Sequence, residues 1–158
     1  MFRPMRRIKK EISLEDTKKL LSSERRGVFA VNGDDGYPYA VPVNFYYDEE
    51  NNKIYFHGAL AGYKADAIRR DDKVCFTVYG NEQIKEEIWA PHMQSAVIFG
   101  RCKIISDDEK KIELLRKVAA KYYPDELTIE DEIAKCGKAA QIYEITIEHM
   151  SGKEVQEK

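Results

Sequence analysis

Residues 55–70 read YFHGALAGYKADAIRR, and within this stretch the pattern of a β-strand gives way to that of an α-helix. Aromatic residues open the stretch, as is typical of strands, and the alanines that follow favour a helix. His57, Gly58, Gly62 and Lys64 stand at the junction. The sequence therefore predicts a strand, a glycine-containing turn and a helix, with a titratable and a basic side chain close to the turn.

The start of the predicted helix suits an anion such as phosphate. The first N–H groups of a helix have no intrahelical partners, and the helix dipole places positive charge there. Gly58 and Gly62 would let the backbone approach the anion closely, and Lys64 could add its charge at the same place. An ordinary turn beside a solvated lysine is the alternative interpretation.

Two prolines mark the segment before this strand, residues 37–47, YPYAVPVNFYY. Because proline cannot donate to a sheet ladder, a strand that carries Pro38 and Pro42 is an edge strand or an interrupted one. We expect pairing to fail around Pro42. The backbone of Val43 and Asn44, with the Asn44 amide, would then be free for a flat heterocycle such as an isoalloxazine. The alternative is an edge strand whose free groups bind water.

The rest of the chain predicts a largely antiparallel sheet. Strands are expected at residues 27–32, 39–47, 53–58, 73–80, 95–105 and 140–155, the last ending in a turn. The first three should form a meander. Regular alternation of strands with crossover helices is missing, which disfavours a doubly wound sheet. The predicted fold class is mainly β (α+β), an antiparallel closed or split β-barrel with peripheral helices.

Helices are expected near the two ends of the chain. A hydroxyl residue stands three positions before an acidic one at Ser13, Ser106 and Thr128, the spacing of a capping box at a helix start. Pro124 should end the second of these helices and Gly137 the third. Apolar residues at helical spacing between residues 112 and 122 predict a helix face that packs on the core.

Composition excludes several classes of function. A chain of 158 residues is expected to fold as one domain, 1–158, and its net charge of −2 gives no general attraction for nucleic acid or anionic membranes. The 3 cysteines form no C-x-x-C pair, and neither His92 nor His149 has partners at metal-ligand spacing, so no metal site is predicted. No segment is long and apolar enough to span a membrane, so we expect a cytoplasmic protein.

Four segments carry a resemblance to a known family: MRRIKKEIS, GYPYAVPVNFYYD, IYFHGALAGYK and SAVIFGR. In this order they resemble the pyridoxamine 5′-phosphate oxidase-like flavoproteins, and within them the nitroimidazole-resistance (Nim-like) branch. The resemblance implies an FMN-binding split barrel that assembles as a homodimer, with FMN in clefts at the subunit interface.

The resemblance also implies roles for individual residues. Pro42, Val43 and Asn44 would lie along the isoalloxazine, His57 and Gly58 near the ring and ribityl chain, and Lys64 at the phosphate. The full set of implied cofactor-binding residues is Pro42, Val43, Asn44, His57, Gly58, Ala59, Gly62, Tyr63, Lys64 and Ser95. Arg6 and Arg7 match the basic start of the family, without a role that we can assign.

The function implied is an FMN-dependent oxidoreductase that passes electrons from NADH or NADPH to a small acceptor, such as a nitroaromatic. His57 is the candidate catalytic residue, because its pKa suits proton transfer near neutrality. The C-terminal EITIEHMSGKEVQEK lacks the arginine that true pyridoxamine 5′-phosphate oxidases use for substrate, so vitamin B6 oxidation is not expected.

Other functions stay open at this point. The chain could be a non-catalytic module that stores or senses flavin, a barrel that binds haem or a deazaflavin, or a scaffold without cofactor. Trp89 could cover the cleft or the subunit interface, or pack in the core.

Overall fold

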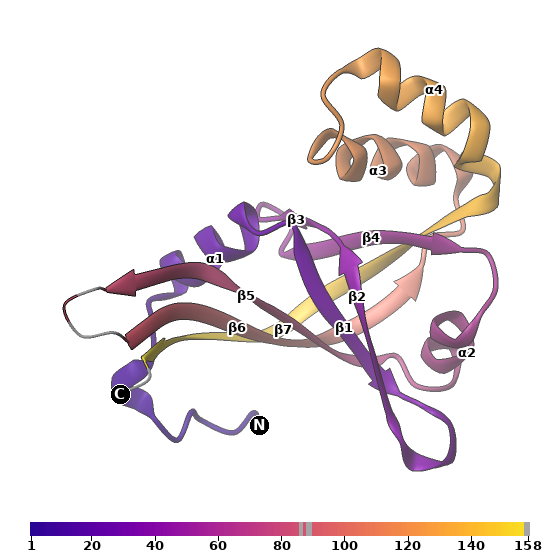
Figure 1. Ribbon diagram of the computed structural model, residues 1–158. Helices are drawn as coiled ribbons and strands as arrows, with labels where there is room; N and C mark the ends of the chain where they lie inside the picture. Colours follow the sequence, from indigo (N-terminus) through magenta and orange to yellow (C-terminus); the bar gives the residue numbers. More distant parts are fainter. Residues whose placement is uncertain (86, 88–89, 157–158) are drawn as a thin grey trace.

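Within the part of the chain that the computed structural model describes, residues 1–85, 87 and 90–156, seven strands form one antiparallel sheet (Figure 1). The strands are β1 (Arg26–Asn32), β2 (Pro38–Asn44), β3 (Tyr46–Asp48), β4 (Lys53–Ala59), β5 (Lys73–Lys85), β6 (Ala90–Ile104) and β7 (Ala140–Gln156). Their order across the sheet is β2-β1-β5-β6-β7-β4-β3. This antiparallel arrangement confirms the predicted fold class.

The first strands pair as the predicted meander requires, β1 with β2 and β3 with β4, but the two pairs lie at opposite edges of the sheet. β2 pairs with β1 at one edge of the sheet, whereas β4 pairs with β7 and β3 at the opposite edge. The sheet curls so that β2 and β4 still come into contact, without forming a ladder. The barrel is therefore split between these two strands, because the chain crosses from one edge to the other where β2 ends.

Pairing does not fail at Pro42, contrary to the sequence prediction. The β1–β2 ladder continues through Val28↔Pro42 to Arg26↔Asn44. Pro42 is tolerated because β2 is an edge strand with no neighbour on its other side. The interruption falls at Phe45 instead, and it divides the single strand expected at residues 39–47 into β2 and β3.

The hydroxyl group of Tyr122 occupies this interruption. It accepts a hydrogen bond from the Phe45 N–H at 2.7 Å and lies 2.6 Å from the Phe45 carbonyl oxygen and 2.5 Å from that of Arg25. The backbone of Phe45 thus points towards β1. Because backbone direction alternates along a strand, the backbone groups of Pro42 and Asn44 point to the free edge, and those of Val43 point towards β1.

The interior of the split barrel is filled by one apolar cluster, formed by the inner face of the curled sheet. Its largest fully buried side chains are aromatic: Phe29, Phe45, Phe56, Phe76 and Tyr143. The ring of Phe56 stacks on that of Tyr143, with centroids 4.8 Å apart. Helices α1 (Leu14–Ser23) and α2 (Tyr63–Arg70) add leucines, alanines and an isoleucine to the same cluster.

The helix starts agree only in part with the sequence. Ser13 caps α1 as predicted, and its hydroxyl accepts a hydrogen bond from the Asp16 N–H. Helix α3 (Asp108–Ala120) is capped by Asp107 rather than Ser106. Helix α4 (Glu126–Cys136) is capped by Asp125, which accepts from the N–H of the residue expected to begin it, Thr128. Aspartate serves as well as serine or threonine at this position.

Helices α3 and α4 form a hairpin outside the barrel (Figure 1). Leu114, Leu115 and Val118 of α3 are buried in a second apolar cluster with Tyr55 of β4 and Ile142 of β7. Side chains alternate between the two faces of β4, so those that point away from the barrel interior face this hairpin. His57, two residues after Tyr55, lies on that outer face.

Up to Gln156, where the described residues end, the C-terminal segment is strand and contains no turn, contrary to expectation. β7 continues to Gln156 because it pairs with β4 over Ala140–Thr146 and with β6 over Tyr143–Gln156. No helix in the described residues has the length and apolar character needed to cross a lipid bilayer.

Candidate functional site

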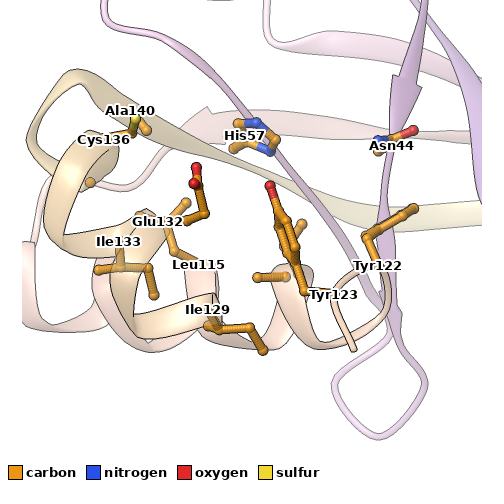
Figure 2. A pocket seen from close by; sticks show the side chains of 13 residues that line it. Asn44, His57, Leu115, Tyr122, Tyr123, Ile129, Glu132, Ile133, Cys136 and Ala140 are labelled. Carbon is orange, nitrogen blue, oxygen red and sulfur yellow. The ribbon is translucent and has the colours of Figure 1, made fainter. Parts of the chain in front are cut away.

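A cleft of about 170 Å³ lies between the α3–α4 hairpin and the outer face of the sheet (Figure 2). The helices supply most of its wall, through Leu115, Val118, Ile129 and Ile133 among others. Asn44, at the end of β2, and His57 line the opposite side. The cleft therefore brings together two residues that were predicted as a site and are 13 positions apart in sequence.

Several polar side chains face this apolar cleft with unused hydrogen-bonding capacity. Within the described residues, no hydrogen bond or ion pair is formed by the side chains of Asn44, His57, Tyr123 or Glu132. Figure 2 shows the carboxylate of Glu132 on α4 and the hydroxyl of Tyr123, in the turn after α3, pointing towards the strand that carries His57. Convergent polar groups on an apolar surface are typical of small-molecule sites.

His57 remains solvent-accessible on β4, where it pairs with Ile142 of β7. The protein atoms packed around its ring desolvate it and lower its pKa below the usual histidine value. The imidazole is therefore neutral at physiological pH, with one nitrogen able to donate and the other able to accept a proton.

The start of α2 has the features predicted for an anion site. Gly62 is its N-cap with φ of 136°, which favours glycine, and it provides no side-chain cap. An added Cβ at Gly62 would meet nothing within 4 Å, so the approach to the helix start is open. Lys64 is the second residue of α2, as predicted, and is half-buried without an ion pair among the described residues.

Tyr63 has a structural role that the sequence did not indicate. Its ring stacks on Tyr39 of β2, with centroids 4.2 Å apart, and its hydroxyl accepts a hydrogen bond from the Asp34 N–H at 2.6 Å. It thus ties the start of α2 to the β1–β2 hairpin. Gly58 is explained by packing, because an added Cβ would lie 3.0 Å from the Tyr143 ring.

The remaining predicted residues lie in three places. Pro42 and Val43 lie on β2 and Ala59 ends β4, all close in sequence to the cleft residues. Ser95 instead lines a different groove, on the outer face of β6, together with Phe2 and His149. Arg6 and Arg7 are exposed in the N-terminal segment. Trp89 lies outside the described residues.

Sequence reasoning missed the contribution of the α3–α4 hairpin. It assigned residues 112–122 to core packing, considered Cys136 only as a cysteine without a C-x-x-C partner, and did not consider Tyr123 or Glu132. All three of these side chains line the cleft. One signal was available, since Glu132 shares a helix face with Ile129, Ile133 and Cys136. A lone carboxylate on an apolar helix face indicates a polar partner or a ligand.

Comparison with known proteins places this geometry in a family. Residues 13–154 match the family described as pyridoxamine 5′-phosphate oxidase. The chain belongs to this family. The match includes every predicted cofactor residue, from Pro42 to Ser95, and the complete α3–α4 hairpin. Comparison with curated proteins gives no match.

Solved structures share the fold of this pyridoxamine 5′-phosphate oxidase family member at low sequence identity. A candidate 5-nitroimidazole antibiotic resistance protein from Bacteroides thetaiotaomicron has a TM-score of 0.77 at 21% identity, over 92% of this chain and 87% of that one. A FAD-binding protein from Mesorhizobium loti has a TM-score of 0.66 at 22% identity, over 92% and 96%. The flavocytochrome Anf3 from Azotobacter vinelandii has a TM-score of 0.72 at 21% identity, over 95% and 71%.

Proposed function

We propose that this protein is an FMN-binding oxidoreductase that passes electrons from NADH or NADPH to a small acceptor such as a nitroaromatic. The observation that carries the proposal is the convergence of Asn44 and His57 on an apolar cleft, with the strand of His57 leading to an open, glycine-capped helix start at Lys64. Membership of the family and the flavin-binding relatives of the same fold support it.

The start of α2 fits the phosphate of FMN. The N–H groups of its first turn have no side-chain cap, and the Lys64 ammonium has no acidic partner among the described residues. A dianion here would be stabilised by the helix dipole, by backbone hydrogen bonds and by the lysine charge. Lys64 and the backbone from Gly62 onwards would therefore hold the phosphate.

The free edge of β2 fits the polar edge of a flat ring. Pro42 has no N–H, but its carbonyl and the backbone of Asn44 face the free edge of β2. The side-chain amide of Asn44 can both donate and accept hydrogen bonds. Because Val43 pairs with Gly27, its backbone is engaged by β1. Asn44 and Pro42 would orient the ring, and Val43 would support the strand behind them.

When bound, FMN would supply hydride and electron transfer that side chains cannot perform. His57 is the residue that we expect to move a proton in the cleft, because its imidazole is neutral and solvent-accessible. The apolar faces of helices α3 and α4 would limit access of water to the same space.

A homodimer is part of the proposal. Ser95 is expected at the cofactor, yet in one chain it lies on the outer face of β6 and not in the cleft of His57. Tyr79 and Phe99 expose large aromatic surfaces on the same outer face as Ser95. A second copy docked through this face would cover these rings and bring its Ser95 towards a cofactor held by the first.

The decisive experiment is an absorption spectrum of the purified protein, recorded before and after NADH or NADPH is added without air, and again after a nitroimidazole is added. We expect the spectrum of bound FMN, its bleaching by the nicotinamide, and recovery with the nitroimidazole. Bound flavin that no nicotinamide reduces would contradict the oxidoreductase and favour a storage or sensing module. A haem spectrum would contradict the FMN assignment.

A further inference from the structure

Glu132 gives the cleft beneath the α3–α4 hairpin a negative charge. Among the described residues that line this cleft, it is the only aspartate, glutamate, lysine or arginine. His57 is neutral there because desolvation lowers its pKa, and the remaining lining residues are apolar or uncharged. The cleft therefore combines one negative charge with an apolar wall.

The negative charge is not neutralised by neighbouring side chains. Arg116 of α3 reaches across to α4, but it is engaged by Glu130 through contacts of 2.5 and 3.1 Å. Glu132 itself is half-buried and has no ion pair or hydrogen bond within the described residues. A half-buried carboxylate without a partner is costly, and a cationic ligand would remove that cost.

The shape of the cleft adds a second requirement. Leu115, Ile129 and Ile133 form an apolar wall that suits a flat hydrocarbon or aromatic group. Figure 2 shows the Glu132 carboxylate at one end of this wall, pointing towards the side where His57 lies. An aromatic ring against the wall could therefore place a charged substituent on Glu132 and remain next to His57.

We propose that this cleft binds a small aromatic molecule that carries a protonated nitrogen, held by Glu132 and packed on α3 and α4. That such a molecule is the substrate, held beside the flavin, rests on the proposed function. Carboxylates and phosphates of similar size are disfavoured by repulsion from Glu132, which separates this site from the anion site at α2.

The test compares three probes of nearly equal shape and different charge: benzylamine, benzyl alcohol and benzoate. Their binding is measured by ligand-observed NMR near neutral pH, with the protein as purified and again saturated with FMN. We expect benzylamine to bind tightest and benzoate weakest. In the Glu132→Gln variant the affinity for benzylamine should fall about tenfold, while that for benzyl alcohol changes little, because a charge-assisted hydrogen bond is lost.

Asp131→Asn is the matched control, since Asp131 precedes Glu132 on α4, is exposed and does not line the cleft. It removes the same charge and should leave all three affinities within about twofold of the original protein. Thermal unfolding of both variants shows whether they are folded. Equal binding of the three probes, or an unchanged preference for benzylamine in folded Glu132→Gln protein, overturns the inference.

The two proposals fail separately. If the protein binds no FMN but prefers benzylamine through Glu132, the cleft specificity stands and the flavin function falls. If FMN binds and is reduced by NADH but benzylamine is not preferred, the flavin function stands and the cleft specificity falls.

Discussion

Where β2 and β1 separate, the hydroxyl group of Tyr122 replaces the backbone partner of Phe45. It accepts a hydrogen bond from the Phe45 N–H at 2.7 Å and lies 2.6 Å from the Phe45 carbonyl oxygen. The two residues are 77 positions apart. Through this contact the turn that follows α3 is attached to the residue that follows Asn44. The helical wall of the cleft and the strand that faces it are thus fixed relative to each other.

Removing this hydroxyl should destabilise the fold. In Tyr122→Phe, the partly buried N–H of Phe45 loses its partner, which we expect to lower the free energy of unfolding by about 1–3 kcal/mol. Urea denaturation measures this change. Tyr123→Phe is the control, because Tyr123 is exposed, and it should change stability by less than about 0.5 kcal/mol. Equal effects of the two substitutions would contradict the structural role of Tyr122.

A buried carboxylate on β7 should make stability depend on acidity. Burial alone would raise the pKa of Glu144, but the ion pair with Lys53 at 2.9 Å and the hydrogen bond from the Tyr55 hydroxyl at 3.1 Å outweigh it, and the pKa lies below its usual value. The folded state therefore gains stability above the ordinary glutamate pKa of about 4.3, and loses it as the pH falls through the lower folded value.

Glu144→Gln tests this dependence. We expect the free energy of unfolding to fall by about 3 kcal/mol at neutral pH, because the lysines that pair with the carboxylate would face an uncharged buried amide. In acid the difference from the original protein should be smaller. Urea denaturation across this pH range measures it. Glu148→Gln, also on β7, breaks an exposed pair with Arg101 and should cost less than about 1 kcal/mol. A difference that stays constant into acid would show that Glu144 is not ionised in the folded protein.

His57 should make stability depend on pH in a higher range than Glu144 does. Desolvation lowers its pKa in the folded state, so below the ordinary value of about 6.5 the unfolded chain binds a proton that the folded chain resists. Stability therefore falls as the pH drops from about 6.5 towards the folded pKa. Proton NMR of the imidazole, assigned with His57→Asn, measures that pKa. A folded value at or above about 6.5 would contradict the prediction.

Lys64 should control affinity for FMN more than turnover. Lys64→Ala removes the ammonium at the start of α2, and we expect FMN binding to weaken at least about tenfold, measured by flavin fluorescence. Lys117→Ala, an exposed lysine on α3, is the control and should bind FMN normally. His57→Ala should instead lower turnover with little change in affinity. Unchanged FMN binding in the Lys64 variant would refute the phosphate assignment.

The sequence predicted local structure better than long-range structure. The junction from β4 to α2 and the Ser13 cap follow from neighbouring residues, because glycine, proline and capping side chains act within a few positions. The interruption at Phe45 was misplaced because it depends on Tyr122, which the sequence places far away. Pro42 alone indicated an edge strand correctly but not where its ladder ends.

For the candidate site, the sequence predicted the residues of the strand side but not those of the helical side. Asn44 and His57 could be found because strand prolines and a histidine before glycine are local signals. Glu132 and Tyr123 could not, because their place beside His57 depends on how the α3–α4 hairpin packs on the outer face of β4. An apolar helix face predicts burial against something, without indicating what it covers.

The prolines of β2 also determine how molecules of this protein can meet. Pro38 and Pro42 are four positions apart, so both missing donors fall on the same exposed border of the sheet. Another strand cannot extend the sheet there with a full set of hydrogen bonds, which protects newly made chains from amyloid-like stacking. Self-association by adding a strand at this border is therefore disfavoured.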